Sequence, residues 1–295
     1  MAGTLPLWRS LLYVPVTNQR FVEKASARGA DVIKLDLEDS IPPAEKPAAR
    51  AAVRDAARVI SNAGTEVLVR INRPWRMTVL DLEAAIWPEI SGLCLPKLES
   101  ADHLAFLDET VEELERERGM PVGSIRFMGL IETPRGLNNV RAIAKASPRL
   151  MGLSLGQEDY SAALGMPGLG PGDLIEDMRL VQRAAREAGI LPLGYAGSIA
   201  EITDMDAFRA SAQRARALGM EGGSCVHPAQ VPILNEVFSP TAEEVETADA
   251  MVAAYDAAMA DGLGAVSFRG KMIDVPVVER ARRVLVLRDR IVGKG

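Results

Sequence analysis

Short apolar runs alternate with longer amphipathic segments from near the start of the chain to about residue 240. A continuous apolar run of this length, stopped by Gly, Pro or a charged residue, is typical of a strand buried on both faces. The segments between the runs carry apolar residues at helical spacing. We predict strands at residues 8–15, 31–38, 66–72, 92–97, 125–133, 150–158, 191–195 and 222–227, and helices that include residues 18–28, 44–63, 101–118, 173–188 and 204–218.

Polar residues end the successive strands at a regular spacing. From Asp39 through Arg70, Lys97, Glu132 and Asp159, neighbouring strand ends lie 27 to 35 residues apart. This is the length of a βα unit, and eight such units close a barrel. An open doubly wound sheet is the alternative, but no Gly-x-Gly-x-x-Gly motif follows the first strand, so its dinucleotide-binding form has no support. We predict the α/β class, with a (β/α)8 TIM barrel in residues 1–238.

The chain continues beyond the eighth unit. Residues 241–261 are typical of a long helix that starts with a capping box formed by Thr241 and Glu244. A glycine-rich segment, residues 262–276, and a last helix, residues 277–291, follow. Because a glycine-hinged segment outside the barrel suits a lid or an arm to a neighbouring subunit, we predict a C-terminal helical extension and lid in residues 239–295.

Composition narrows the function classes. The chain is 48% apolar and 25% charged, as in ordinary soluble proteins. Its 4% aromatic content and net charge of -6 argue against nucleic acid and anionic membranes as partners. No apolar run approaches the ~20 residues of a membrane span, and the start lacks the apolar core of a signal peptide. Cys94 and Cys225 fall in predicted buried strands, which favours free core thiols and a cytoplasmic protein.

Two strands end abruptly in carboxylates: residues 127–131 run into Glu132, and residues 150–155 lead to the Glu158-Asp159 pair. A carboxylate at the exit of a strand is held at the mouth of the sheet, where hard cations find oxygen ligands. Mg²⁺ keeps several waters and needs only two protein oxygens. We predict that Glu132 and Asp159 bind one Mg²⁺; pairing of these acids with basic strand-end residues is the alternative.

Three acids, Asp36, Glu38 and Asp39, end the second strand. Carboxylates this close repel one another and need cations or donors nearby. We expect them to surround and position the ligands of the site; solvated acids at a helix start are the alternative. Neither histidine is predicted to act, since His227 is interpreted as structural and His103 begins a helix.

Basic residues also follow strands. We expect Arg70 to contact substrate oxygens, because its planar fork suits carboxylates, with an ion pair to Glu38 and Asp39 as the alternative. For Lys97 a structural ion pair is at least equally supported, and nearby carboxylates would keep its pKa too high for a Schiff-base nucleophile. Arg9 is a candidate anion contact or a surface charge.

Eight motifs follow one another from about residue 8 to the end: Arg9-Ser10-Leu11-Leu12-Tyr13-Val14-Pro15, Leu35-Asp36-Leu37-Glu38-Asp39, Val69-Arg70-Ile71-Asn72, Leu95-Pro96-Lys97, Ile131-Glu132-Thr133-Pro134-Arg135-Gly136, Gly156-Gln157-Glu158-Asp159, His227-Pro228-Ala229-Gln230 and Gly270-Lys271-Met272-Ile273-Asp274-Val275-Pro276. Taken together and in this order, they resemble the HpcH/HpaI aldolase/citrate lyase family, most of all its citrate lyase beta-subunit-like and malyl/citramalyl-CoA lyase group.

The resemblance implies a magnesium-dependent barrel enzyme that cleaves or forms a C–C bond in a 3-hydroxyacyl-CoA, with an acyl-CoA and a 2-oxo acid as partners. It implies a homo-oligomer, either a trimer or a dimer of trimers. By position, Glu132 and Asp159 would bind Mg²⁺, and Arg70 would contact the substrate. Asp274 would reach in from an adjacent subunit as the acid/base. With the candidate from the first strand included, the predicted substrate contacts are Arg9, Arg70 and Glu132. Residues 193–199 lack the acids that relatives carry around the seventh strand, so the acyl group is left open.

Rival functions remain at this stage. One is a metal-dependent aldolase for free 2-oxo acids, against which the lid-like residues 262–276 argue. A related variant is hydrolysis of the acyl-CoA thioester. Another is a non-catalytic acyl-CoA-binding subunit of a larger complex. The sequence names neither the acyl group nor the direction used in the cell.

Overall fold

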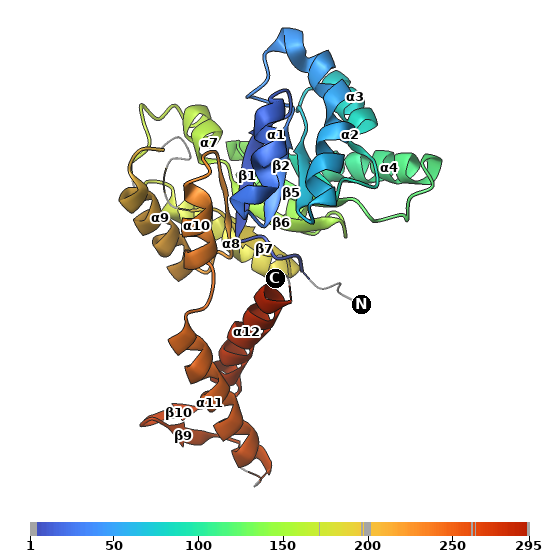
Figure 1. The fold of residues 1–295 in the computed structure, drawn as a ribbon. Helices are drawn as coiled ribbons and strands as arrows, with labels where there is room; N and C mark the ends of the chain where they lie inside the picture. The colour runs from blue at the N-terminus through green and yellow to red at the C-terminus, as the bar shows by residue number, and fades with distance from the viewer. Residues whose placement is uncertain are drawn as a thin grey trace. The chain divides into compact units, whose positions relative to one another are not determined.

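The computed structural model describes residues 5–170, 172–195, 197, 202–260, 262 and 264–293. The chain divides into two compact units, Met1–Glu236 and Val237–Gly295. The first unit is built on eight parallel strands (Figure 1): β1 (Ser10–Pro15), β2 (Val32–Asp36), β3 (Glu66–Arg70), β4 (Gly92–Leu95), β5 (Arg126–Ile131), β6 (Leu150–Leu155), β7 (Leu191–Leu193) and β8 (Gly223–Cys225).

The strands curl into a nearly closed barrel. Their hydrogen-bonded order is β7-β6-β5-β4-β3-β2-β1-β8, so β7 and β8 stand at its two ends. Backbone hydrogen bonds join these ends: Gly194 N donates to Gly222 O at 2.7 Å, and Glu221 N donates to Pro192 O at 2.9 Å. The predicted α/β class and TIM-like barrel are confirmed.

The barrel interior is apolar where the strands face one another. Six strands contribute to one buried cluster, which consists of Trp8, Leu11, Val32, Leu68, Cys94, Met128, Leu130, Leu191 and Leu193. Inward and outward faces are both buried along most strands because helices cover the outside. Cys94 and Cys225 are buried and free, as predicted.

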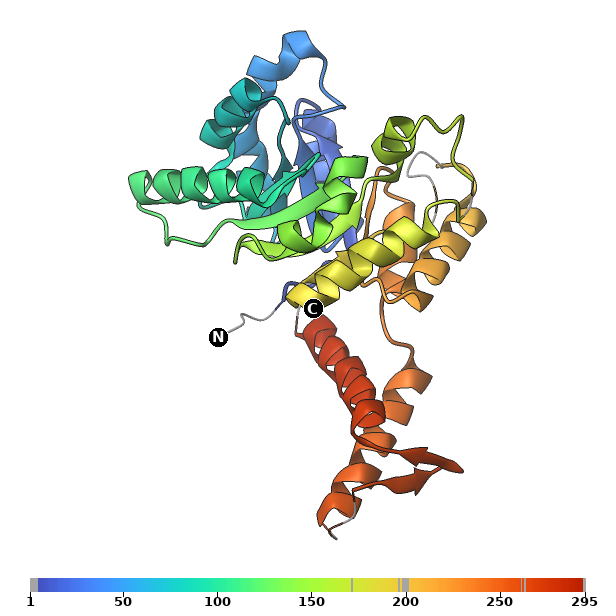
Figure 2. The same ribbon diagram turned by 180° about the vertical axis from the view of Figure 1, so that it is seen from behind.

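Helices lie outside the strands (Figures 1 and 2), and α8 packs on β6 and β7. They are α1 (Gln19–Ala25), α2 (Lys46–Asn62), α3 (Trp75–Ala85), α4 (Ala101–Glu117), α5 (Pro134–Asn138), α6 (Val140–Ala144), α7 (Gln157–Ala163), α8 (Ile175–Ala188), α9 (Met205–Ala217) and α10 (Gln230–Val237), with short 3₁₀ turns at Ser26–Arg28 and Pro43–Glu45. In the described part of the chain, no helix is long and apolar enough to cross a membrane.

The second unit pairs two long helices, α11 (Ala242–Ala260) and α12 (Val275–Val292). Between them lies an antiparallel hairpin of β9 (Val266–Phe268) and β10 (Lys271–Ile273), which the sequence analysis did not predict. Its turn uses Arg269 and Gly270, both at positive φ. Tyr255, Ile273 and Val278 form the buried centre of this unit. Residue 261, the expected end of the first long helix, lies outside the described residues.

Candidate active site

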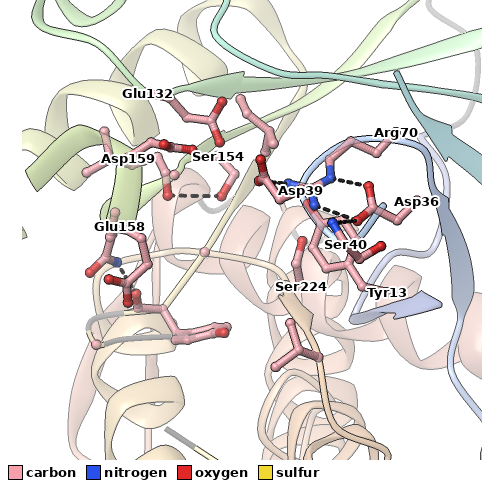
Figure 3. Close-up of a pocket in the computed structure, with 18 of the residues that line it drawn as sticks. Tyr13, Asp36, Asp39, Ser40, Arg70, Glu132, Ser154, Glu158, Asp159 and Ser224 are labelled. Atoms are coloured by element: carbon pink, nitrogen blue, oxygen red, sulfur yellow. Dashed lines mark hydrogen bonds and ion pairs between the residues drawn. The ribbon is translucent and has the colours of Figure 1, made fainter. Parts of the chain in front are cut away.

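A pocket of about 470 Å³ opens at the carboxyl ends of the barrel strands (Figure 3). This volume is in the range of small-molecule sites, and this face is where barrel enzymes keep their chemistry. Every lining residue belongs to the first unit. The lining includes five predicted site residues, which are Asp36, Asp39, Arg70, Glu132 and Asp159.

Glu132 is a buried carboxylate held by its backbone surroundings. It follows β5, is 4% exposed, and its Oε2 accepts a hydrogen bond from Lys97 N at 2.8 Å. Burial, with the nearby Glu38 carboxylate, raises the pKa of Glu132 to about 7. A Cβ on Gly156 would lie 2.4 Å from Glu132 Cγ and 2.5 Å from Oε1. Glycine at position 156 therefore leaves the space that this carboxylate occupies.

Asp159 reaches the same pocket from the first turn of α7, three residues after Gly156. Lys97, whose backbone N–H binds Glu132, contacts Asp159 and Glu38 with its side chain. Its ammonium Nζ lies 3.2 Å from Asp159 Oδ2 and 3.1 Å from Glu38 Oε1. Burial lowers the pKa of Lys97, but the carboxylates of Glu132, Glu38 and Asp159 outweigh it and hold that pKa above the usual range. The ion-pair alternative for Lys97 is what the structure shows, and its amine is a poor nucleophile at neutral pH.

The backbone of Lys97 has a left-handed conformation, with φ 50°. Such a conformation costs a residue other than glycine about 1–3 kcal/mol and is concentrated at functional sites. It turns the chain directly after β4, so that the backbone N–H of Lys97 faces Glu132.

Arg70, the last residue of β3, forms ion pairs with three carboxylates. Its Nε and Nη2 both donate to Asp36 at 2.7 Å, and Nη1 donates to Asp39 Oδ2 at 3.0 Å. Nη1 also lies 2.8 Å from Glu38 Oε2, although that oxygen accepts no hydrogen bond within the described residues. Burial would raise the pKa of Asp36, but the bonds from Arg70 keep it below its usual range.

The ion-pair alternative for Arg70 is therefore present in the structure, but it does not use the whole side chain. A guanidinium has five N–H groups. Among the described residues, one N–H of Nη2 has no acceptor, and Arg70 lines the pocket. An ion pair and a substrate contact are compatible.

Arg9 is not at this site. It precedes β1, whereas the pocket lies beyond the other end of that strand, at Pro15. Its guanidinium forms a fork with Asp31, which precedes β2, at 2.8 and 2.9 Å. The expectation that Arg9 contacts the substrate is not supported, because a residue that precedes a parallel strand lies at the amino end of the barrel.

Asp274 belongs to the second unit and is not part of the pocket lining. It caps α12: its Oδ1 accepts from Val277 N at 3.4 Å. An acid between Ile273 and Val275 thus has a local structural role that the sequence analysis did not consider. His227 is exposed, and its Nδ1 accepts from Ala229 N. His103 is buried and does not line the pocket.

Sequence reasoning missed several residues of the pocket, among them Tyr13, Ser224 and Tyr195. It also missed Lys34, which is fully buried behind Tyr13 and Ser224. Lys34 precedes Asp36 by two residues, and the period of two along a strand could have placed both on the inner face. Residues 196 and 198–201, next to Tyr195, lie outside the described residues.

The donor set offers a cation oxygen ligands from Glu132 and Asp159. Within the described residues, no group of three or more His, Cys, Asp or Glu side chains is arranged to hold a metal ion. A two-carboxylate site suits a hard cation that keeps its waters, as Mg²⁺ does, better than zinc.

A family model described as HpcH/HpaI aldolase/citrate lyase matches residues 9–228. The chain belongs to this family. The match covers the whole barrel, including the strand ends that carry Arg70, Glu132 and Asp159. The resemblance found in the motifs is confirmed, and the chain is an enzyme of a lyase family.

Curated relatives of this family extend over nearly the full chain. Citrate lyase subunit beta of Leuconostoc mesenteroides subsp. cremoris is 34% identical over 287 residues, 96% of this chain and 94% of the relative. L-malyl-CoA/beta-methylmalyl-CoA lyase of Cereibacter sphaeroides is 33% identical over 299 residues, 94% of this chain and 93% of the relative.

A solved structure also matches. Protein CitE of Mycobacterium tuberculosis, in complex with magnesium, acetoacetate and coenzyme A, has a TM-score of 0.75 and 29% identity. The match covers 98% of this chain and 100% of that chain. The relatives therefore match both the barrel and the C-terminal helices of this family member.

Proposed function

We propose that this protein is a Mg²⁺-dependent C–C lyase that cleaves, or forms, a 3-hydroxyacyl-CoA such as citramalyl-, malyl- or citryl-CoA. The products of cleavage are an acyl-CoA and a 2-oxo acid. The observation that carries the proposal is the pair of carboxylates, Glu132 and Asp159, in a pocket at the carboxyl ends of the barrel. The full-length relatives named as citrate lyase beta subunit and malyl-CoA lyase support it.

The residues present fit a magnesium ion. Glu132 is a buried acid whose pKa is raised by burial and by the neighbouring Glu38 and Asp159 carboxylates, so a cation beside it would stabilise its ionised form. The ammonium of Lys97 already stands between acids of this cluster, so the place favours a cation. Glu132 and Asp159 would hold the ion, and Gly156 keeps the space for Glu132. When bound, the metal would supply Lewis-acid stabilisation of negative charge on substrate oxygen.

The remaining roles fall to side chains of this protein. Cleavage takes a proton from the 3-hydroxyl group, breaks the C–C bond, and returns a proton to the carbon of the acyl-CoA enolate. The spare N–H of Arg70 would donate to the oxygen on which charge develops. Asp274, from an adjacent subunit of a trimer or hexamer, would exchange the proton at the enolate carbon.

The test is a coupled assay of the purified protein with malyl-, citramalyl- and citryl-CoA, with and without EDTA. We expect release of a 2-oxo acid and an acyl-CoA from at least one substrate, lost in EDTA and restored by Mg²⁺. Free CoA without C–C cleavage would instead identify a thioesterase. A free 2-oxo acid aldol is assayed in parallel, and its cleavage in place of the acyl-CoA substrates would identify an aldolase. No turnover of any substrate would favour a non-catalytic subunit.

Two substitutions separate the metal from the fold. Glu132→Gln and Asp159→Asn keep the size of each side chain and remove its charge. Both should abolish Mg²⁺-dependent turnover while thermal unfolding in EDTA stays close to that of the wild type. Full activity in EDTA, or in the double variant, would contradict the proposed metal site.

A further inference from the structure

Lys34 is a buried lysine directly behind the pocket wall. It lies in β2, its side chain has no exposed surface, and burial lowers its pKa to about 8. Its Nζ donates to Ser224 Oγ at 2.5 Å and lies 3.8 Å from the centre of the Tyr13 ring. In the described part of the chain, no carboxylate forms an ion pair with Lys34.

Ser224 turns this buried cation toward the pocket. It lies in β8, lines the pocket, and its hydroxyl projects into the cavity (Figure 3). An ammonium can only donate hydrogen bonds, so Ser224 Oγ is the acceptor in its pair with Lys34. The hydroxyl proton of Ser224 is thus free to donate, and it has no acceptor among the described residues. A hydroxyl that accepts from a cation is also a stronger donor.

Carboxylates outnumber cationic side chains along the rest of the pocket wall. Its charged lining consists of five carboxylates and the guanidinium of Arg70, which is already surrounded by Asp36, Glu38 and Asp39. The amine of Lys97 is likewise held between two carboxylates. Ser224, with Lys34 behind it, is the part of this wall where a hydroxyl donor is backed by a cation that forms no ion pair with a carboxylate of the described residues.

We propose that Lys34 positions the Ser224 hydroxyl as the donor for a carboxylate oxygen of the 2-oxo acid, so that the pair selects a charged substrate over a neutral one. The inference rests on the proposed function for the identity of this ligand. Lys34 is a positioning residue, since it acts through Ser224, which would touch the substrate.

The test measures binding rather than turnover alone. Lys34→Met, Ser224→Ala and the double variant are titrated with pyruvate and with its neutral analogue pyruvamide, by calorimetry at saturating Mg²⁺. A hydrogen bond to a charged group makes a difference of about tenfold or more in affinity. We expect each single variant to weaken pyruvate binding by about that factor, with a much smaller change for pyruvamide. Because Lys34 acts through Ser224, the double variant should lose little more than either single variant.

Ser154→Ala is the matched control. Ser154 lines the same pocket, but its hydroxyl donates to Leu155 O at 3.5 Å and has no lysine behind it. The effects of Ser154→Ala and Lys34→Met should therefore be additive. If Ser224→Ala leaves the preference for pyruvate over pyruvamide unchanged, the proposal is wrong, even if Lys34→Met fails to fold. Additive effects of Lys34→Met and Ser224→Ala would also overturn it.

These outcomes are distinct from failure of the proposed function. A protein that binds pyruvate through Lys34 and Ser224 but cleaves no acyl-CoA would retain this inference and lose the lyase proposal. If the protein is an active lyase but neither substitution changes its KM for the 2-oxo acid in the condensation direction, the lyase proposal is kept and this inference is lost.

Discussion

Gly156→Ala tests the geometry of the proposed metal site with a single methyl group. The backbone of Gly156, at φ -82° and ψ 90°, is not left-handed, so alanine can adopt the same backbone conformation. Its Cβ, however, would lie 2.4 Å from Glu132 Cγ, where carbon atoms in contact are normally about 3.5–4.0 Å apart. Glu132 must therefore move by about 1 Å, and a move of this size is incompatible with the strict octahedral geometry of Mg²⁺.

We expect Gly156→Ala to weaken Mg²⁺ binding by about 10- to 100-fold, as loss of groups that orient a metal ligand does. Stability should fall by about 1–3 kcal/mol, because the clash reaches Cγ of a buried side chain rather than only its end. The assays are Mg²⁺ titration by calorimetry and the shift of thermal unfolding with Mg²⁺.

Gly168→Ala is the control, since a Cβ there meets nothing within 4 Å. In the double variant Gly156→Ala/Glu132→Asp, the shorter side chain of Asp leaves room for the added methyl group. The losses of Mg²⁺ affinity in the two single variants should therefore be less than additive. Wild-type Mg²⁺ affinity in Gly156→Ala would refute the assignment of Glu132 as a ligand held in place by Gly156.

Three further predictions use the same structure. Arg70→Lys should lower kcat/KM by about 10- to 100-fold more than Asp36→Asn does; equal losses in enzyme assays would mean that Arg70 acts only through its ion pair. Burial lowers the pKa of His103 to about 4. Neutral His103 therefore favours the folded state fully above pH 6.5, and this contribution to stability is lost as the pH falls from 6.5 to 4. Urea unfolding of His103→Phe should lack this loss, and parallel curves for the two proteins would contradict it. Asp274→Asn keeps the helix cap and should be stable but inactive, whereas Asp274→Ala should also lose about 1 kcal/mol of stability. Mixed oligomers of Asp274→Asn and Glu132→Gln chains should regain activity. Inactive mixed oligomers would exclude a shared site.

The barrel could be predicted because each strand is a short apolar run buried on both faces. The ends were less accurate: the predicted strand at residues 92–97 stops at Leu95, since Lys97 adopts a left-handed conformation that no local pattern announces. The hairpin β9–β10 was missed because its glycines indicated a hinge, whereas Arg269-Gly270 forms a turn between two short strands.

Some residues of the pocket could also be predicted from the sequence, and others were missed. Glu132, Asp159 and Arg70 could be found because each is a charged residue just after an apolar run. Lys34 was missed because a lysine inside the run Val32-Ile33-Lys34-Leu35 looks like an interruption of a strand, although its spacing of two from Asp36 places both on one face. Arg9 was considered as an anion contact or a surface charge from its adjacency to a strand alone, and the structure adds that it adjoins the amino end, away from the pocket.

Lys97 shows why the site breaks local rules. Glycine would adopt its left-handed backbone without strain, yet the structure has a lysine there. Both ends of the residue are used: the backbone N–H binds Glu132, and the ammonium lies between Glu38 and Asp159. Glycine would keep the first contact and lose the second, which would leave Glu132 and Asp159 without the Lys97 ammonium and Glu38 with Arg70 as its cation. One strained residue thus positions both expected metal ligands and offsets their repulsion, which accounts for lysine at a position that favours glycine.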